Sequence, residues 1–133
     1  MKNVSAAREY FKDDLFAVEA AGIEIVEAQD GYAKCVMRPE KRHQNAAGFV
    51  MGGAIFTLAD YTFAVAANTD DTNAVSLTST INFLAPAKGD MLTAETEELK
   101  IGRSICAFHV RVTDTAGTLV AVLSGTGFRT PRK

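Results

Sequence analysis

The sequence contains no tryptophan and only two cysteines among its 133 residues. Cys35 and Cys106 lie far apart and match no metal-ligand spacing, which excludes a zinc site built on paired cysteines. A disulfide between them is possible, but nothing in their positions favours one. We therefore expect two buried free thiols, the usual state of cysteine in a reducing cytosol.

Long apolar runs and an excess of basic charge are also missing. No stretch is both apolar and charge-free over the length that a membrane span needs, and the N-terminal segment carries charges where a signal peptide would be apolar. The net charge of −2 gives no reason to expect nucleic acid as the main partner. These absences predict a cytoplasmic protein that binds neither nucleic acid nor membrane.

Two segments have helical character. Val4, Ala7, Phe11 and Leu15 recur at three- and four-residue steps, which predicts a short amphipathic N-terminal helix over residues 4–16. The run G-A-I-F-T-L-A-D-Y-T-F-A-V-A-A-N, at about residues 53–68, contains no Lys, Arg or Pro and is apolar almost all round. Such a helix is expected to be buried rather than to lie on the surface.

The remaining segments are typical of strands. Residues 22–29 and Tyr32–Met37 flank the dipeptide Asp30-Gly31, which predicts a hairpin. A polar, glycine-containing loop follows at residues 40–52. Four further segments rich in Val, Ile, Thr and Phe are separated by turn residues: Ala74–Phe83, Met91–Ile101, Arg103–Asp114 and Thr118–Arg129.

These elements predict an α+β fold in a single domain over residues 1–133. Apolar residues make up 47% of the chain, enough for one core. An antiparallel sheet of about six strands would wrap its apolar face around the long helix. The other sheet face must then be polar or covered, and self-association is a common way to cover it.

The start of the long helix and one residue within it point to chemistry. Gly52 and Gly53 let the backbone approach a ligand closely, and the first N–H groups of a helix lack internal partners and lie at the positive end of its dipole. Such a terminus can stabilise the oxyanion of acyl transfer. Asp60 is the only residue of the helix that carries a charge at neutral pH. Either it bonds a neighbouring backbone N–H or it is functional, and the glycine pair favours function.

The spacing of these residues predicts an assembly. Asp60 follows Gly52 by eight residues, about 12 Å along a helix axis, whereas reacting atoms must approach to about 3–3.5 Å. Two antiparallel helices from two subunits would bring each Asp60 near the other chain's Gly52. We therefore expect an active site shared across a two-fold dimer.

Residues 45–68 resemble the signature of the PaaI-like branch of hotdog-fold thioesterases. That signature has Asn, two residues, Gly, two residues and His-Gly-Gly, with Asp eight residues after the first glycine of the pair. Asn45, Gly48, Gly52, Gly53 and Asp60 match it. The run V-S-L-T-S-T-I-N-F-L-A-P-A-K-G-D also resembles the strand and turn that follow in the family.

The resemblance implies an acyl-CoA thioesterase of the hotdog fold, with CoA as part of the substrate and no cofactor or metal. Asp60 would act as general base or nucleophile, the Gly52 N–H would polarise the thioester carbonyl, and Asn45 would hold the substrate or orient the leaving sulfur. Ser76 would support the attacking water or Asp60. A homodimer at minimum, and a dimer of dimers by similarity, is expected.

The remaining expected contacts concern the substrate. Met51 stands where the family has histidine, which predicts a changed pocket rather than lost activity. The family pattern and the apolar helix imply substrate-binding roles for Gly53, Met51, Phe56, Tyr61 and Arg103. The acyl group would lie in an apolar slot between the two helices of the dimer, near Phe56, Leu58, Tyr61 and Phe63. Arg103 could meet a CoA phosphate, as could one of the other basic residues of the strand half: Lys88, Lys100, Arg111 and Arg129.

Competing sites are weaker. Cys106 and His109 are separated by an odd number of residues and would face opposite sides of a strand, which argues against a nucleophilic dyad. His43 could shuttle protons, although a solvent-exposed loop histidine is the more common outcome. A non-catalytic acyl-CoA binding or sensing module on the same fold would not need Asp60, and a hotdog dehydratase or hydratase would need a catalytic histidine, for which His43 is the nearby candidate.

Overall fold

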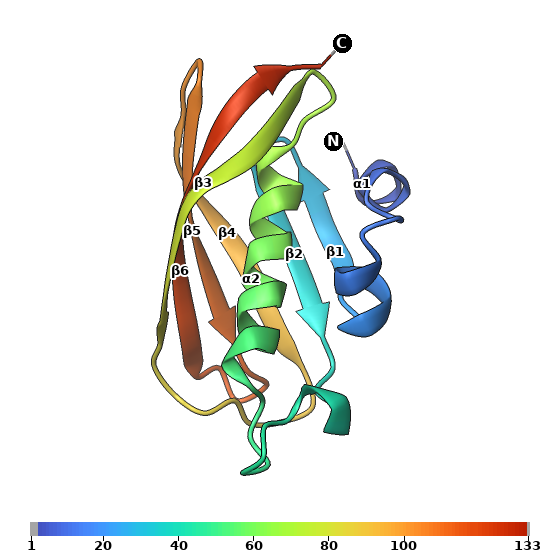
Figure 1. The fold of residues 1–133 in the computed structure, drawn as a ribbon, viewed down its shortest axis with the longest axis vertical. Coiled ribbons are helices and arrows are strands. Elements are labelled where there is room, and N and C mark those ends of the chain that lie inside the picture. Colours follow the sequence, from blue (N-terminus) through green and yellow to red (C-terminus); the bar gives the residue numbers. More distant parts are fainter. Residues whose placement is uncertain (1–2, 133) are drawn as a thin grey trace.

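One long helix, α2 (Gly52–Ala67), lies in the concave face of a six-stranded antiparallel sheet (Figure 1). The computed structural model describes residues 3–132. The strands follow the spatial order β1-β2-β4-β5-β6-β3. Their bounds are β1 Glu24–Gln29, β2 Tyr32–Met37, β3 Thr72–Phe83, β4 Leu92–Ile101, β5 Ile105–Thr113 and β6 Leu119–Pro131. The predicted α+β arrangement of helix and six strands is confirmed.

The β1–β2 hairpin forms where the Asp30-Gly31 pair predicted it. Gly31 has a φ of +80°, a left-handed conformation that glycine adopts without a steric penalty. Its N–H donates to the Ala66 carbonyl at 3.1 Å, which ties the hairpin to the last turn of α2. The turn chemistry of the sequence therefore sets both the strand pairing and the position of the helix end.

The N-terminal helix is shorter than predicted. Helix α1 (Val4–Tyr10) is capped by Asn3, whose Oδ1 accepts from the Ala6 N–H at 2.8 Å, and it ends before Phe11. A turn follows, and then a short π-helix, η1 (Phe16–Ala20). The prediction that Leu15 belongs to the buried face was wrong, because the break rotates it outward and leaves it 53% exposed.

Helix α2 is buried on the sides that face the sheet. Leu58 and Val65, seven residues apart and therefore on one side of the helix, are almost fully buried. The Phe63 ring packs edge-to-face on Phe108 of β5, with ring centroids 5.5 Å apart. A β-carbon at Gly125 of β6 would lie 3.2 Å from the Phe63 ring, so the glycine lets helix and sheet approach closely.

Two other predictions concern the cysteines and membrane spans. Cys35 and Cys106 are free and buried, as expected. Among residues 3–132, no helix has the length and apolar character needed to cross a membrane.

Phe63→Ala should unfold the protein more readily, because it removes a buried ring from the contact between α2 and the sheet. We expect a loss of about 3–5 kcal/mol in the free energy of unfolding, measured by urea denaturation. Phe16→Ala is the matched control, since Phe16 is 73% exposed. Equal losses for the two variants would contradict this account of the core.

Candidate active site

The N-terminus of α2 carries two unbonded backbone donors. Met51 is the N-cap residue and offers no side-chain cap, while its carbonyl accepts from the N–H groups of Ala54 and Ile55. Within residues 3–132 no acceptor lies in hydrogen-bond range of the Gly52 or Gly53 N–H. Free donors at the positive end of a helix dipole form a site for an oxygen that carries negative charge.

The Gly52 end of the helix faces an apolar pocket of about 450 Å³. A β-carbon at Gly52 would lie 3.1 Å from Cζ of Phe83, the last residue of β3, so the ring packs directly against the helix start. The pocket is lined by Phe49, Val50, Gly52, Ile55, Phe83, Leu84, Ala85, Pro86 and Ala87. This lining combines one end of strand β3 with the loop that precedes the helix.

Asp60 lies on the one face of α2 that the sheet leaves open. Gly53, Thr57 and Ala64 share this face, at helical spacing from Asp60, and all are at least partly exposed. No hydrogen bond or ion pair engages the Asp60 carboxylate within residues 3–132, so the alternative that it bonds a backbone N–H is not realised. Partial burial raises the pKa of Asp60 above its ordinary value.

Two adjoining pockets flank this open face. The first, of about 350 Å³, contains Asp60 and is lined by Asp14, Leu15, Phe16, Ala17, Thr57, Asp60, Tyr61 and Ala64. The second, of about 470 Å³, is lined by Phe16, Ala20, Ala21, Arg42, His43, Met51, Gly53, Ala54 and Thr57. Phe16 and Thr57 line both, so the pockets form one groove between α2 and the segment 14–21. The predicted substrate contacts Met51 and Gly53 therefore lie in the same groove as Asp60.

Asp60 and Gly52 do not meet within one chain. Both belong to one uninterrupted α-helix, and their eight-residue separation corresponds to about 12 Å along its axis. A single carbonyl group cannot contact both. Catalysis by this pair therefore requires two chains.

Asn45 holds the loop before the helix. Its Oδ1 accepts from the N–H groups of Ala47 at 3.0 Å and Phe49 at 3.1 Å, and its own N–H donates to the Phe49 carbonyl. Gly48, at φ +86°, completes this turn. The side-chain oxygen of Asn45 is thus occupied by the loop, and its amide nitrogen has no recorded bond among the described residues. The structure gives Asn45 a loop-organising role that the sequence did not predict.

Ser76 and Arg103 lie in different parts of the sheet. Ser76 is directly opposite Gly127 in the β3–β6 pairing, and a β-carbon at Gly127 would meet the Phe63 ring of α2, so Ser76 is on the helix-facing side of the edge strand. Arg103 lies in the β4–β5 turn, at the end of the molecule opposite the start of α2 (Figure 1). Arg129 braces that turn by donating to the Gly102 carbonyl.

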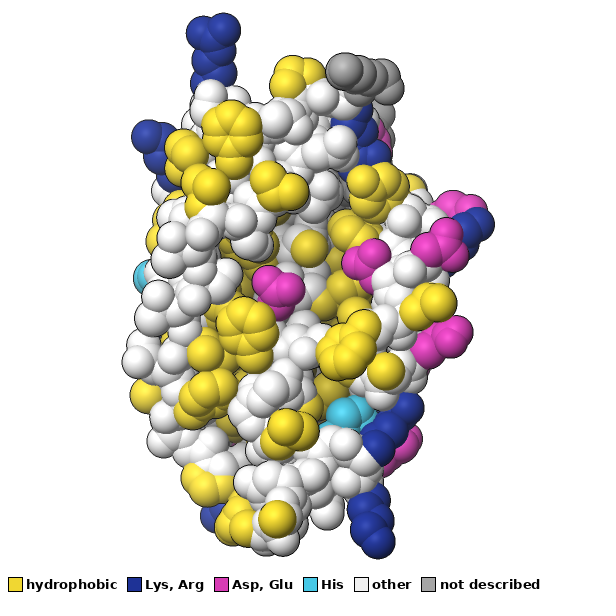
Figure 2. All heavy atoms as spheres, in the orientation of Figure 1, with side chains coloured by type: hydrophobic (Ala, Val, Ile, Leu, Met, Phe, Trp, Pro, Cys, Tyr) yellow, Lys and Arg dark blue, Asp and Glu magenta, His cyan; other side chains and the backbone are white. Residues whose placement is uncertain are grey.

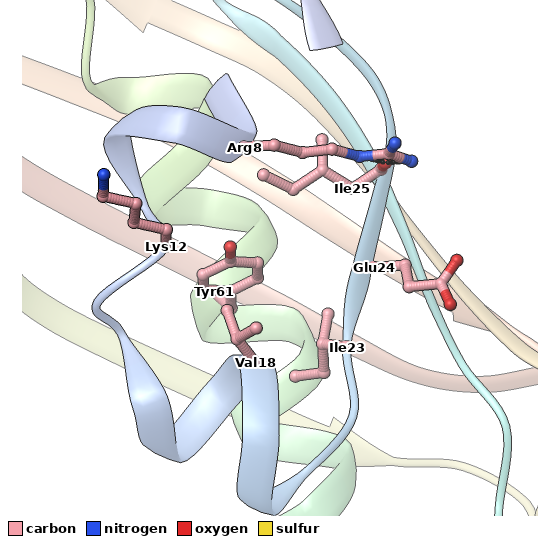
Figure 3. Close-up of a pocket in the computed structure, with 7 residues that line it drawn as sticks. All are labelled: Arg8, Lys12, Val18, Ile23, Glu24, Ile25 and Tyr61. Carbon is pink, nitrogen blue, oxygen red and sulfur yellow. Dashed lines mark hydrogen bonds between the residues drawn. The ribbon is translucent and has the colours of Figure 1, made fainter. Parts of the chain in front are cut away.

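The aromatic residues of α2 divide between groove and core. Tyr61 forms a wall of the Asp60 pocket, and its ring packs edge-to-face on Phe11. On its other side Tyr61 lines a separate hollow with Arg8, Lys12 and β1, which contains neither Asp60 nor Gly52 (Figure 3). Phe56 is half-buried and packs against the core. The expectation that Leu58 and Phe63 line the acyl slot was wrong, because both face the sheet and are buried.

His43 is buried, contrary to the expectation of an exposed loop histidine. Its Nδ1 accepts from the Glu40 N–H and its Nε2 donates to the Ala21 carbonyl, both at 2.8 Å. The His43 carbonyl in turn accepts from the Met51 N–H. Arg42 adds a bond to the Glu19 carbonyl. These contacts clamp the end of η1 to the start of α2 and leave neither imidazole nitrogen free for the proton transfer that a dehydratase or a proton shuttle would need.

The rejected Cys–His pair is also separated in space. Cys106 is buried on the helix side, whereas His109 is on the other face, with Nδ1 3.5 Å from Glu97 Oε1. Among residues 3–132, no group of three or more His, Cys, Asp or Glu side chains is arranged to hold a metal ion.

The sequence did not indicate the contribution of segment 14–17 to the groove. Phe16 was placed at the end of an amphipathic helix, yet it stands 73% exposed beside the open face of α2. The charged run Lys12–Asp14, which interrupts the apolar pattern after Phe11, was the available signal for a break in the helix.

Apolar side chains gather around this face of the molecule. Figure 2 shows hydrophobic groups on both sides of a hollow over α2, with Lys and Arg at the periphery. Strand β3 is an edge of the sheet, and exposed apolar residues lie along it and beside it: Val75, Leu77, Phe83, Leu84, Phe49 and Met51. A long apolar edge is a surface on which another strand can pair.

Comparisons with known proteins identify the family of this chain. Residues 47–121 match the family model described as the thioesterase superfamily. A putative esterase of Archaeoglobus fulgidus is 36% identical over 90% of this chain and 77% of its own length. The acyl-coenzyme A thioesterase PaaI of Escherichia coli is 31% identical over 92% of this chain and 88% of its own length.

Solved structures show the same architecture. The E. coli PaaI structure superposes with a TM-score of 0.88 at 29% identity, covering 95% of this chain and 91% of that one. A hypothetical thioesterase of Streptococcus pneumoniae, solved with coenzyme A, has a TM-score of 0.83 at 29% identity over 92% of this chain and 98% of that one. The sequence match and the fold lead to one assignment: the chain belongs to the thioesterase superfamily, in its PaaI-like hotdog branch.

Proposed function

We propose that the protein hydrolyses an acyl-CoA thioester to a free acid and CoA, with Asp60 as the catalytic carboxylate. The observation that carries the proposal is a partly buried carboxylate, without a partner among residues 3–132, on the open face of α2 in a groove that also includes Gly53 at the helix start. The acyl-CoA thioesterase relative described above supports this substrate class. No metal or separate cofactor is required, since CoA is part of the substrate.

The chemistry uses the two ends of the proposed site. Asp60 takes a proton from water as the water oxygen attacks the thioester carbonyl, and the raised pKa makes its carboxylate a stronger base. The carbonyl oxygen becomes an oxyanion beside the Gly52 N–H. The C–S bond then breaks, and the CoA sulfur leaves and receives the proton. A carboxylate can also attack the carbonyl directly and form an anhydride that water hydrolyses.

A two-fold dimer would assemble this site. Antiparallel pairing of β3 with the β3 of a second copy would cover the exposed apolar edge and place the two α2 helices antiparallel. Each Asp60 would then approach the other chain's Gly52, which packs on Phe83 at the end of β3. A dimer of dimers is the larger assembly that we expect.

The same symmetry gives Arg103 a role. Within one chain the β4–β5 turn lies at the end opposite Gly52, so an antiparallel partner would bring its own turn toward that glycine. Arg103, with Arg129 and Lys100 nearby in the same hairpin region, would then be placed to meet CoA phosphates. The structure of the S. pneumoniae relative, which contains coenzyme A, supports binding of the CoA part of the substrate.

Release of free CoA thiol tests the function. Wild-type protein should hydrolyse at least one member of a panel of short, medium, long and aromatic acyl-CoAs. Asp60→Asn, which keeps the shape and removes the base, should lose about 10²–10⁴-fold in kcat, measured with a thiol reagent. Binding of acyl-CoA without turnover across the panel would favour a non-catalytic acyl-CoA module, with Met51 as the residue to examine.

Asp60→Asn should also stabilise the fold at neutral pH. Burial raises the pKa of Asp60 in the folded state above its unfolded value of about 3.8. Protonated Asp60 therefore contributes fully to the free energy of unfolding below the unfolded pKa, and this contribution is lost as pH rises through the folded pKa. In urea denaturation at fixed protein concentration, the free energy of unfolding of Asp60→Asn should exceed that of wild type at pH 7 and equal it near pH 3.5. Asp13→Asn, at an exposed position, is the control. A less stable Asp60→Asn at pH 7 would indicate a structural carboxylate instead.

Mixing two inactive variants tests the shared site. Gly52→Pro removes the N–H at the first helical position, where proline is tolerated, and Met51 has a compatible φ of −70° and ψ of 149°. Gly52→Ala is the control, because it adds the same β-carbon near Phe83 and keeps the N–H. The expected loss for Gly52→Pro is about 10²–10³-fold.

Co-refolding Gly52→Pro with Asp60→Asn in equal amounts should restore about a quarter of wild-type activity, since half the dimers are mixed and each mixed dimer has one intact site of two. Activity no higher than that of the separate variants would place both groups within one chain.

A further inference from the structure

The pocket beside Asp60 contains a second carboxylate that the proposed chemistry does not use. Asp14, two residues before η1, lines the wall opposite α2, while the rest of the lining is apolar apart from Thr57, Asp60 and Tyr61. Among residues 3–132, no Lys, Arg or His lines this pocket. The Thr57 hydroxyl already donates to the Gly53 carbonyl at 2.8 Å.

The Asp14 carboxylate has no structural partner among residues 3–132. The backbone carbonyl of Asp14 accepts from the Val18 N–H, but its side chain caps no N–H group and forms no ion pair. Burial raises the pKa of Tyr61, and the charges of Cys35 and Asp14 add to that effect. Asp14 is exposed and lines the pocket together with Tyr61, so its negative charge lies at the wall of the pocket that contains Asp60.

We propose that Asp14 is a specificity-determining residue that makes this site select acyl groups without a negative charge and reject acyl groups that end in a carboxylate. This inference rests on the proposed function, because it takes the Asp60 pocket as the acyl site. A terminal carboxylate entering the pocket would meet two like charges and no cation. A neutral acyl chain would contact Leu15, Phe16 and Tyr61 instead, and would gain from apolar burial.

Paired substrates of equal chain length test the proposal, because the CoA portion cancels in their ratio. Wild type, Asp14→Asn and Asp13→Asn are compared on pentanoyl-CoA and glutaryl-CoA, which differ in the terminal carboxylate. Wild type should prefer pentanoyl-CoA in kcat/KM. Asp14→Asn should narrow that preference by about five- to tenfold, the scale of one charge pair at a partly exposed site. Asp13→Asn, which removes the same charge one residue away and outside the pocket, should leave the preference unchanged.

Salt supplies a readout that a purely structural role would not change. The exposed charge of Asp14 is screened by ions, so the wild-type preference should shrink between 20 mM and 500 mM NaCl, while that of Asp14→Asn should change less. An equal preference in wild type and Asp14→Asn, or glutaryl-CoA hydrolysed by wild type as fast as pentanoyl-CoA, would overturn the proposal.

Binding separates this proposal from the proposed function. Dissociation constants of the same two thioesters for Asp60→Asn and for the double variant Asp14→Asn/Asp60→Asn can be measured by calorimetry without turnover. If wild type hydrolyses no member of the acyl-CoA panel described above, the proposed function fails, and the ratio of dissociation constants for these two thioesters then decides the role of Asp14. A ratio unaffected by Asp14→Asn would overturn that role.

Discussion

The packing of α2 into the concave sheet is the constraint on which the site depends. Leu58 and Val65 face the centre of the sheet, and Phe63 is held by the glycines of β6 and by Phe108, so the helix has one orientation about its own axis. That orientation leaves a single face open, and Asp60 is on it. A rotation of the helix by one residue, about 100°, would move Asp60 away from the groove. The packing of the core therefore fixes the direction in which the Asp60 carboxylate points.

The loops around the helix fix the rest of the groove. His43 bonds to backbone groups on both sides of it and so joins η1 to the residue that caps α2. Asn45 closes the turn between His43 and the helix by bonding two N–H groups with one side-chain oxygen. The groove wall and the helix start consequently form one connected unit, although they lie about thirty residues apart in the sequence. A structural change in the groove wall should therefore shift the helix start, and the reverse, through these backbone hydrogen bonds.

The parts of the fold that could be predicted are those with local causes. The Asp30-Gly31 turn, the apolar helix and the alternating strands each carry their own signal within a few residues. The parts that could not be predicted depend on distant contacts. Phe16 follows a helical pattern, yet it is exposed because the chain turns after Phe11, and His43 is buried because Ala21 offers it a carbonyl. The site divides in the same way. The spacing of Asp60 and Gly52 is visible in the sequence, whereas the groove wall beside Asp60 depends on contacts between distant segments.

An unpartnered carboxylate in the wall of a groove is costly to keep, and a fold under selection for stability alone would replace it or give it a partner. The apolar lining around Asp60 lowers the local polarity, which raises its pKa and strengthens it as a base. The features that destabilise the carboxylate are thus the features that would make it a stronger base in the proposed hydrolysis. The same reasoning applies to the free N–H groups of Gly52 and Gly53, which a side-chain cap at Met51 would satisfy and thereby make unavailable to the proposed oxyanion. Met51, which stands at the position of the histidine in the family pattern, lines the groove and offers these donors no side-chain cap, so they stay available to a ligand.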